Sequence, residues 1–251
     1  METLFVGKNI IYLPVVESTN SYAIDLLKNV NPLEGTVVHA AHQTQGKGQR
    51  GSVWNSEPSS NLTVSIILKP SFLALKNQFY LYMIAALACY DTTAELLSTG
   101  QFDIKIKWPN DILVNRKKVA GILIENKLSN SSISHSVLGI GINLNQLIFP
   151  DAKAGSIKNF AKREINIEQV LKRLCYHTEH YYLLLKKSKL EELKSLYLTH
   201  LLGLGKTLNF VYRDSSVPFK VLGIGDTGLL LLQDSGGLIK EMDVKEVTWQ
   251  L

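Results

Sequence analysis

The sequence predicts an α+β protein with a small all-β unit at its C-terminal end. Up to Gly203, short β-branched runs typical of strands alternate with stretches that carry the 3.6-residue apolar period of helices. After Gly203 only short apolar runs remain, separated by Gly, Asp and Ser, which favours a small β-barrel. We therefore expect two domains, residues 1–203 and residues 204–251.

The elements of the first domain can be placed from apolar runs, capping residues and breakers. The same pattern predicts a hairpin around a basic turn at Arg116-Lys117 and a loop over residues 150–165. Strands are expected at 10–16, 36–41, 62–68, 105–111 and 137–145, and in the hairpin 112–127; for the run 62–68 we expect alternating burial. Helices are expected at 19–30, 78–98, 167–187 and 189–202.

Composition indicates a globular protein with a mild basic excess. The 251 residues are 45% hydrophobic and 20% charged, with a net charge of +5 and an isoelectric point near 9.0. Such a charge fits an anionic small ligand as well as a nucleic acid. Because the basic residues are spread along the chain without a clustered stripe, nucleic-acid binding is the weaker expectation.

Cysteine usage and the absence of targeting signals predict a cytoplasmic protein. The two cysteines, Cys89 and Cys175, sit in apolar helical patterns without metal-binding spacing, as expected of buried thiols in a reducing compartment. The N-terminus lacks the basic and apolar regions of a signal peptide. The longest apolar run, residues 81–90, is too short to cross a bilayer.

A glycine-rich loop is the strongest candidate for ligand binding. Gly46, Gly48 and Gly51 alternate with the cations Lys47 and Arg50, with no apolar period. Glycines let the backbone approach a ligand closely, and successive N–H groups in such loops can form an anion nest. We expect the loop to wrap a phosphate-bearing or carboxylate-bearing ligand.

Two familiar phosphate-binding motifs do not fit this loop. The spacing of its glycines matches the dinucleotide fingerprint, but no helix pattern follows, and Pro58 comes soon after. In the P-loop motif a lysine would stand where this chain has Ser52. The same glycine spacing recurs at residues 223–228 between two apolar runs, where a hairpin turn is the simplest interpretation.

Polar and small residues at strand positions suggest a second part of the same site. Ser18-Thr19-Asn20 either cap the following helix or face a ligand from a strand end. Gly121 inside a strand indicates a bulge or a close approach by a ligand. Gly139 and Gly141 share one strand face with Asn143, so that face is bare and could admit a flat ring.

These residues together resemble the biotin protein ligases, over essentially the whole chain. No one motif is decisive, but all occur in the family's order. The motifs are Ser18-Thr19-Asn20; Gln43 with Gly46-Lys47-Gly48-Gln49-Arg50-Gly51 and Trp54; Lys107-Trp108-Pro109-Asn110-Asp111; Lys118 with Ala120-Gly121-Ile122; and Gly139-Ile140-Gly141-Ile142-Asn143.

The resemblance implies an adenylating ligase that acts in two steps. Biotin would react with ATP, accompanied by Mg²⁺, to give biotinyl-5′-AMP and pyrophosphate; a lysine of a biotin carboxyl carrier protein would then attack, releasing AMP. It also implies a mixed sheet flanked by helices, the class II synthetase-like biotin/lipoate ligase fold, for the catalytic biotin- and ATP-binding domain 1–203, and an SH3-like barrel for 204–251.

The resemblance also assigns roles to residues. It implies that Lys118 neutralises the α-phosphate, that Lys47 holds the biotin carboxyl and the phosphate, and that Asp111 orients or deprotonates the incoming amine, or pairs with a basic residue. Asn143 would read the adenine edge. The implied binding set is Ser18, Thr19, Asn20, Gln43, Gly46, Lys47, Gly48, Gln49, Arg50, Gly51, Trp54, Lys118, Gly121 and Asn143.

The sequence departs from the family pattern in the loop and beyond it. Lys47 and Gln49 stand where arginine is common, which removes bidentate geometry and weakens the grip on the intermediate. No tryptophan near residues 150–162 could stack on adenine. Because the first strand begins by Ile10, we expect no DNA-binding domain and therefore a ligase that is not a repressor.

Other functions stay open at this stage. A lipoate or octanoate ligase or transferase shares the fold, although the motifs at 107–111 and 46–51 favour biotin. A nucleic-acid-binding protein is a second alternative, and a biotin-binding regulator without catalysis is a third, against which Lys118 argues. No membrane partner is expected, and a homodimer is left open.

Overall fold

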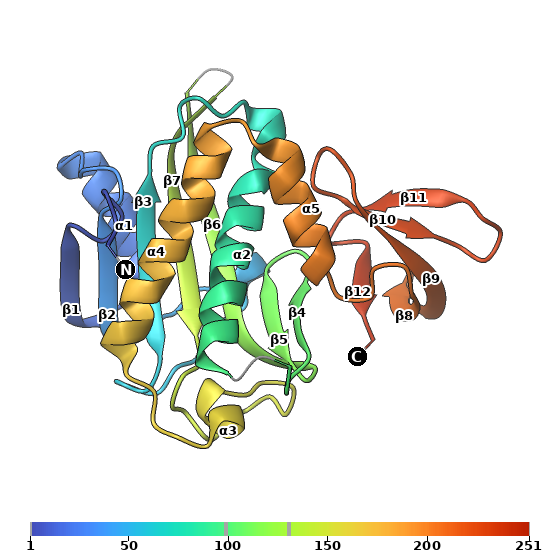
Figure 1. Cartoon of the computed structure of the whole chain (residues 1–251), viewed down its shortest axis with the longest axis horizontal. Helices are drawn as coiled ribbons and strands as arrows, with labels where there is room; N and C mark the ends of the chain where they lie inside the picture. Colours follow the sequence, from blue (N-terminus) through green and yellow to red (C-terminus); the bar gives the residue numbers. More distant parts are fainter. Residues whose placement is uncertain (1, 98–99, 130–131, 251) are drawn as a thin grey trace.

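The computed structural model describes residues 2–97, 100–129 and 132–250, and it has two sheets (Figure 1). The larger sheet has the strand order β1-β2-β3-β7-β6-β5-β4, in which only β1 and β2 pair in parallel. Its strands are β1 (Ile10–Val16), β2 (Val37–Gln43), β3 (Leu62–Leu68), β4 (Ile104–Lys107), β5 (Asp111–Val114), β6 (Lys117–Ser129) and β7 (Ser132–Ile142). The predicted mixed sheet is confirmed.

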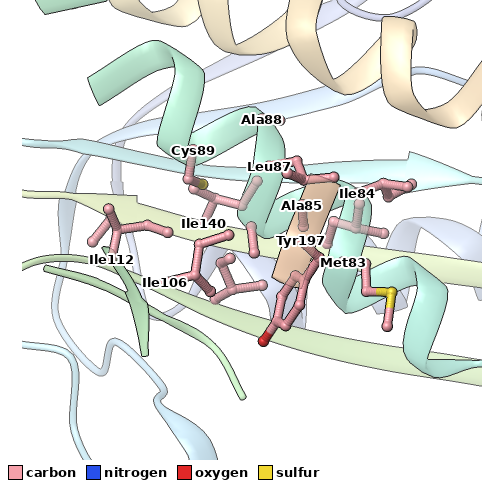
Figure 2. Close-up of a cluster of buried hydrophobic side chains, with 14 of the residues drawn as sticks. Met83, Ile84, Ala85, Leu87, Ala88, Cys89, Ile106, Ile112, Ile140 and Tyr197 are labelled. Carbon is pink, nitrogen blue, oxygen red and sulfur yellow. The ribbon is translucent and has the colours of Figure 1, made fainter. Parts of the chain in front are cut away.

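Helices cover both faces of this sheet. On one face lie α2 (Phe79–Leu96), α4 (Ile167–Lys186) and α5 (Leu190–His200), while α1 (Thr19–Asn29) lies on the other (Figure 1). The side chains of α2 meet Ile106, Ile112 and Ile140 of the sheet and Tyr197 of α5 in one apolar core (Figure 2). No helix in the described part of the chain is long and apolar enough to cross a membrane.

The burial of β3 differs from the expected alternation. Leu62, Val64 and Ile66 belong to the core under α2 and α4, whereas Ile67 belongs to the core under α1. Every residue of the strand is buried, including Ser65, because α1 covers the second face as well. A central strand covered on both sides cannot show the half-exposed pattern that the sequence suggested.

The C-terminal sheet is antiparallel and matches the predicted SH3-like barrel. Its order is β11-β10-β9-β8-β12, from β8 (Thr207–Tyr212), β9 (Ser215–Ile224), β10 (Leu230–Gln233), β11 (Ile239–Met242) and β12 (Val247–Trp249). The glycines at 223–228 lie where β9 turns into β10, as expected of a hairpin. The indole N–H of Trp108 donates to the Gly228 carbonyl at 2.9 Å, and that of Trp249 donates to the Trp108 carbonyl at 3.2 Å.

Several predicted boundaries shift in the structure. The loop expected at 150–165 contains a short helix, α3 (Ile157–Ala161), which opens with a capping box at Ser156 and Asn159. The hairpin turn falls on Asn115 and Arg116, which both have positive φ, rather than on Arg116-Lys117. The predicted helix end at Ser98 lies outside the described residues. Cys89 and Cys175 are buried free thiols, and burial raises the pKa of Cys175 to about 12.

Candidate active site

One cavity of about 220 Å³ gathers most of the predicted site residues. It lies where the start of α1, the end of β2, the glycine loop and the strands β5, β6 and β7 meet. The predicted residues that line it are Ser18, Thr19, Asn20, Gln43, Lys47, Gly48, Gln49, Trp54, Asp111, Lys118 and Gly121. The bare strand positions Gly139 and Gly141 line it too, as does Asn110 of the motif at 107–111. Leu123, which the sequence did not single out, also lines it.

Three of the predicted residues that the structure describes in full, Gly46, Gly51 and Asn143, do not line this cavity. Gly46 faces a neighbouring hollow of about 640 Å³, which shares Gln43, Val53 and Trp54 with the cavity. Gly51 and the backbone of Arg50 belong to a short turn, and the Arg50 side chain lies outside the described part. Asn143 comes one residue after β7, and its amide donates to the Gly155 carbonyl at 3.0 Å.

The glycine loop folds back on itself as a small hairpin. The Gly48 N–H donates to the Ser52 carbonyl at 2.7 Å, and the Trp54 N–H donates to the Gly46 carbonyl at 2.9 Å. A Cβ on Gly46 would lie 2.3 Å from the Trp54 carbonyl oxygen, so only glycine permits this approach. These two amides donate within the loop and are therefore not available to an anion in this conformation.

A tryptophan side chain lies on the bare strand face. A Cβ on Gly141 would be 2.4–2.8 Å from the Trp54 indole, and one on Gly121 would be 3.0 Å from it. The flat ring that the glycines admit is therefore the protein's own. The Trp54 ring nitrogen is buried and has no partner among the described residues. The Lys118 ammonium lies 5.6 Å from the centre of the same ring, within reach of a cation–π attraction.

A β-bulge turns Lys118 into the cavity. Lys118 and Gly121 are three residues apart, so a regular strand would place them on opposite faces. The pairing of Ile112 with Ala120 and of Leu113 with Lys118 leaves Val119 as an extra residue in β6. This bulge brings the Lys118 ammonium to within 3.3 Å of where a Cβ on Gly121 would lie. The bulge that Gly121 suggested therefore lies next to it, in β6. The side chains that approach Gly121 are the protein's own Trp54 and Lys118, and the close approach by a ligand stays a prediction.

The Lys118 ammonium forms an ion pair with Asp111. The distance from Lys118 Nζ to Asp111 Oδ1 is 2.7 Å, and Lys107 Nζ lies 3.4 Å from Asp111 Oδ2. The Asp111 side chain is 12% exposed and that of Lys118 is 36% exposed, so solvent screens the pair only in part. Lys118 is therefore not a fully solvated hairpin lysine, and Asp111 has basic partners, as one of its expected roles required.

Ser18-Thr19-Asn20 act as more than a helix cap. Ser18 occupies the N-cap position of α1, yet its side chain makes no capping hydrogen bond. The N–H and the hydroxyl of Thr19 lie 2.8 and 3.0 Å from Gln43 Oε1. The Asn20 amide donates to Glu125 at 2.9 Å and to the Leu123 carbonyl at 3.3 Å. The side chains of Thr19 and Asn20 thus join α1 to the end of β2 and to the middle of β6, and Ser18, Thr19 and Asn20 all line the cavity.

Comparison with known proteins shows the family. Residues 12–143 match the model of the biotin/lipoate A/B protein ligase family. The bifunctional ligase/repressor BirA of Bacillus subtilis is 33% identical over 245 residues, which cover 96% of this chain and 74% of that protein. The biotin–[acetyl-CoA-carboxylase] ligase of Paracoccus denitrificans is 39% identical over 129 residues, 51% of each chain.

The fold agrees with these matches. The structure of a biotin protein ligase from Aquifex aeolicus in complex with biotin and ATP has a TM-score of 0.79 to this one, at 27% identity, and the match covers 97% of this chain and 99% of that chain. The likeness therefore extends over both sheets. This chain belongs to the biotin/lipoate A/B protein ligase family, as one of its biotin protein ligases.

Proposed function

We propose that the chain activates biotin as biotinyl-5′-AMP and transfers the biotinyl group to a lysine of a biotin carboxyl carrier protein. In the first step a carboxylate oxygen of biotin attacks the α-phosphorus of ATP, and pyrophosphate leaves. In the second step the lysine amine attacks the acyl carbon, AMP leaves, and the nitrogen loses a proton. The observation that carries the proposal is the ion pair between Lys118 and the buried carboxylate of Asp111, in a cavity that polar side chains also line.

In this proposal Lys118 offsets the charge that builds when a carboxylate meets a triphosphate. Preorganised positive charge aimed at developing negative charge is a large contribution to catalysis. Lys107 lies near the same carboxylate and would share this task, while Lys47 approaches from the exposed loop. Mg²⁺ usually keeps several waters and binds through substrate phosphates, so we propose that it enters with ATP.

The size of the cavity limits what it can hold. Pockets for drug-sized ligands usually measure about 300–1,000 Å³, so a cavity of about 220 Å³ suits the ring and part of the acyl chain of biotin. The nucleotide would then occupy the neighbouring hollow, which Trp54 and Phe149 both line. We propose that these two aromatic rings cover adenine in place of the tryptophan that the family pattern leads one to expect.

The adenine contact assigned to Asn143 stays a prediction. Asn143 is 3% exposed, and its Oδ1 has no hydrogen-bond partner within the described residues. That oxygen could accept a bond from the adenine amino group. Asn143 lines neither hollow, so the segment between it and Gly155 would have to move before the nucleotide reached it.

The direct test is incubation with biotin, Mg·ATP and a carrier domain, followed by mass detection of the modified lysine. We expect one biotinyl group per carrier, and pyrophosphate release that requires biotin. Lipoate and octanoate serve as controls for the alternative ligase activity. Pyrophosphate release with lipoate and none with biotin would overturn the proposal. A salt-dependent filter-binding measurement checks the prediction that this chain does not bind DNA.

A further inference from the structure

Five side chains form a continuous line of polar contacts beneath the cavity. Glu125 accepts from the Asn20 amide at 2.9 Å, and Asn20 Oδ1 lies 2.6 Å from the hydroxyl of Ser65. That hydroxyl lies 2.8 Å from Thr19 Oγ1, which in turn lies 3.0 Å from Gln43 Oε1. We call these five residues the oxygen chain. Neither Ser65 nor Glu125 belongs to the site motifs.

The orientation of both amides is fixed by their neighbours. The nitrogen of Asn20 faces two acceptors, Glu125 Oε2 and the Leu123 carbonyl, so its oxygen must face Ser65. Gln43 Oε1 accepts the backbone N–H of Thr19 at 2.8 Å, so the Gln43 nitrogen must point elsewhere. The two amides therefore present oxygens, and no protons, to the hydroxyl groups between them.

The oxygen chain is consequently one proton short. It contains three close oxygen–oxygen contacts: Asn20 to Ser65, Ser65 to Thr19, and Thr19 to Gln43. Each hydroxyl carries a single proton, so Ser65 and Thr19 supply two protons for three contacts. One contact must then bring lone pairs together without a proton between them. Buried acceptors left in that state are unfavourable unless another donor reaches them.

No other side chain of the described residues donates to this line of oxygens, so the missing donor has to come from the cavity. Thr19 and Asn20 line it, whereas Ser65 is fully buried on β3 behind them. The Asn20 amide is pressed against the backbone of Gly139, where a Cβ would lie 2.2 Å from Asn20 Oδ1. This contact hinders rotation of the amide, and the Glu125 carboxylate disfavours its flipped form because two acceptors would then face each other.

We propose that Ser65 and Glu125 are positioning residues, which hold Thr19 and Asn20 so that their oxygens accept a hydrogen bond from a ligand. The oxygen chain thereby selects ligands whose ring carries an N–H donor. The inference rests on the proposed function and deepens it. A urea ring carries two such N–H groups, whereas the dithiolane of lipoate and the alkyl chain of octanoate carry none. Failure to supply a hydrogen bond to a buried polar site is a strong basis for rejection.

The test compares biotin with two cyclic carbamate analogues, in each of which one ring N–H is replaced by oxygen. This change keeps the size of the ring and turns a donor into an acceptor. We expect the wild-type protein to bind one of the two analogues about ten- to a hundredfold more weakly than biotin, by calorimetry and by KM in pyrophosphate release.

Glu125→Gln tests the polarity of the chain. A glutamine amide can donate to Asn20 and allow it to flip, which supplies the missing proton from within the protein. Discrimination is the ratio of the dissociation constant of the more weakly bound carbamate to that of biotin. We expect this variant to lower that ratio by about tenfold and to leave the KM for ATP unchanged. Ser65→Ala should also reduce it, because the link between Asn20 and Thr19 is removed.

Matched controls separate this effect from loss of structure. Ser136→Ala removes a fully buried hydroxyl on β7 that has no partner within the described part, and Glu168→Gln removes an exposed carboxylate on α4. Both should discriminate as the wild type does, and circular dichroism should show all four variants folded.

The possible negative results count against different claims. If the wild type rejects the carbamate and Glu125→Gln and Ser65→Ala reject it equally, the oxygen chain does not select the donor. The same conclusion holds if the wild type accepts biotin and both carbamates equally. If the wild type does not bind biotin or release pyrophosphate with it, the proposed function itself fails.

Discussion

The Lys118 ammonium and the Asp111 carboxylate lie 2.7 Å apart on neighbouring strands, and both line the same cavity. An anionic substrate that Lys118 neutralises must share that ammonium with Asp111. In the proposed function the pair links the two steps, because Lys118 would offset the charge on the phosphate and Asp111 would orient the arriving amine.

Lys118→Met should abolish adenylation and leave the fold intact. A charge pair at about 4 Å in an effective dielectric near 20 is worth about 4 kcal/mol at most, so a loss of roughly a hundredfold or more in kcat is expected. Pyrophosphate release measures this loss. The matched control is Lys117→Met, since Lys117 is the adjacent and more exposed lysine of the same strand. Near wild-type turnover in Lys118→Met would contradict its proposed role.

Asp111→Asn should impair transfer more than adenylation. The change leaves the positive charges of Lys107 and Lys118 in place for the phosphate but removes the carboxylate that would orient the amine. Single-turnover pyrophosphate release should fall less than the rate of carrier labelling from preformed adenylate. Equal losses in both steps would show that Asp111 serves only to hold the two lysines.

Gly141→Ala should weaken biotin binding. The added Cβ would lie 2.4 Å from the Trp54 indole, well inside van der Waals contact, so the ring or the strand has to move. We expect KM for biotin to rise about tenfold, which corresponds to roughly 1.4 kcal/mol, with a smaller change in KM for ATP. Gly236→Ala is the control, because its Cβ would meet nothing closer than 3.4 Å. An unchanged KM for biotin in Gly141→Ala would argue against this role of the glycine.

Trp249→Phe should lower activity beyond its effect on stability. It removes the bond from the Trp249 indole to the Trp108 carbonyl, which precedes the segment that carries Asp111. Loss of one such bond costs about 1 kcal/mol of unfolding free energy, measurable by urea titration. We expect kcat to fall as well. Leu232→Val is the control: it removes a methylene from the core of the same sheet, and it should lower stability by a similar amount without lowering kcat. Unchanged kcat would confine the contact to stability.

Glu95→Gln should lower stability at neutral pH but not in acid. Desolvation opposes ionisation of this carboxyl, but its contacts with Arg173 and His177 outweigh that effect and hold the pKa of Glu95 below 4.5. A carboxyl group whose pKa is lowered in the folded state stabilises the fold at any pH above its ordinary pKa. That contribution is lost as the pH falls through the lowered pKa of the folded state. The difference from wild type, under about 1 kcal/mol for such an exposed pair, should vanish in urea titrations toward pH 3. A difference that persists there would exclude the charge as its cause.

Much of the fold could be predicted from local pattern. The strands β1 and β3 begin and end at the predicted residues, because their apolar runs are bounded by clear breakers. The helix α3 was missed because it has five residues, too few to show an apolar period, although Ser156 and Asn159 form a capping box. The motif residues at the cavity were found through the family resemblance.

The sequence by itself determined which residue types the site contains and in which order along the chain they occur. Only the tertiary structure decided that a bulge at Val119 turns Lys118 toward Asp111. In a regular strand Lys118 would lie on the opposite face from Gly121, outside the cavity. Likewise, the alternation along residues 62–68 does not reveal that α1 covers Ser65 and brings Thr19 and Asn20 within hydrogen-bond reach of it. Side-chain contacts between distant segments depend on packing and register, which no local period encodes.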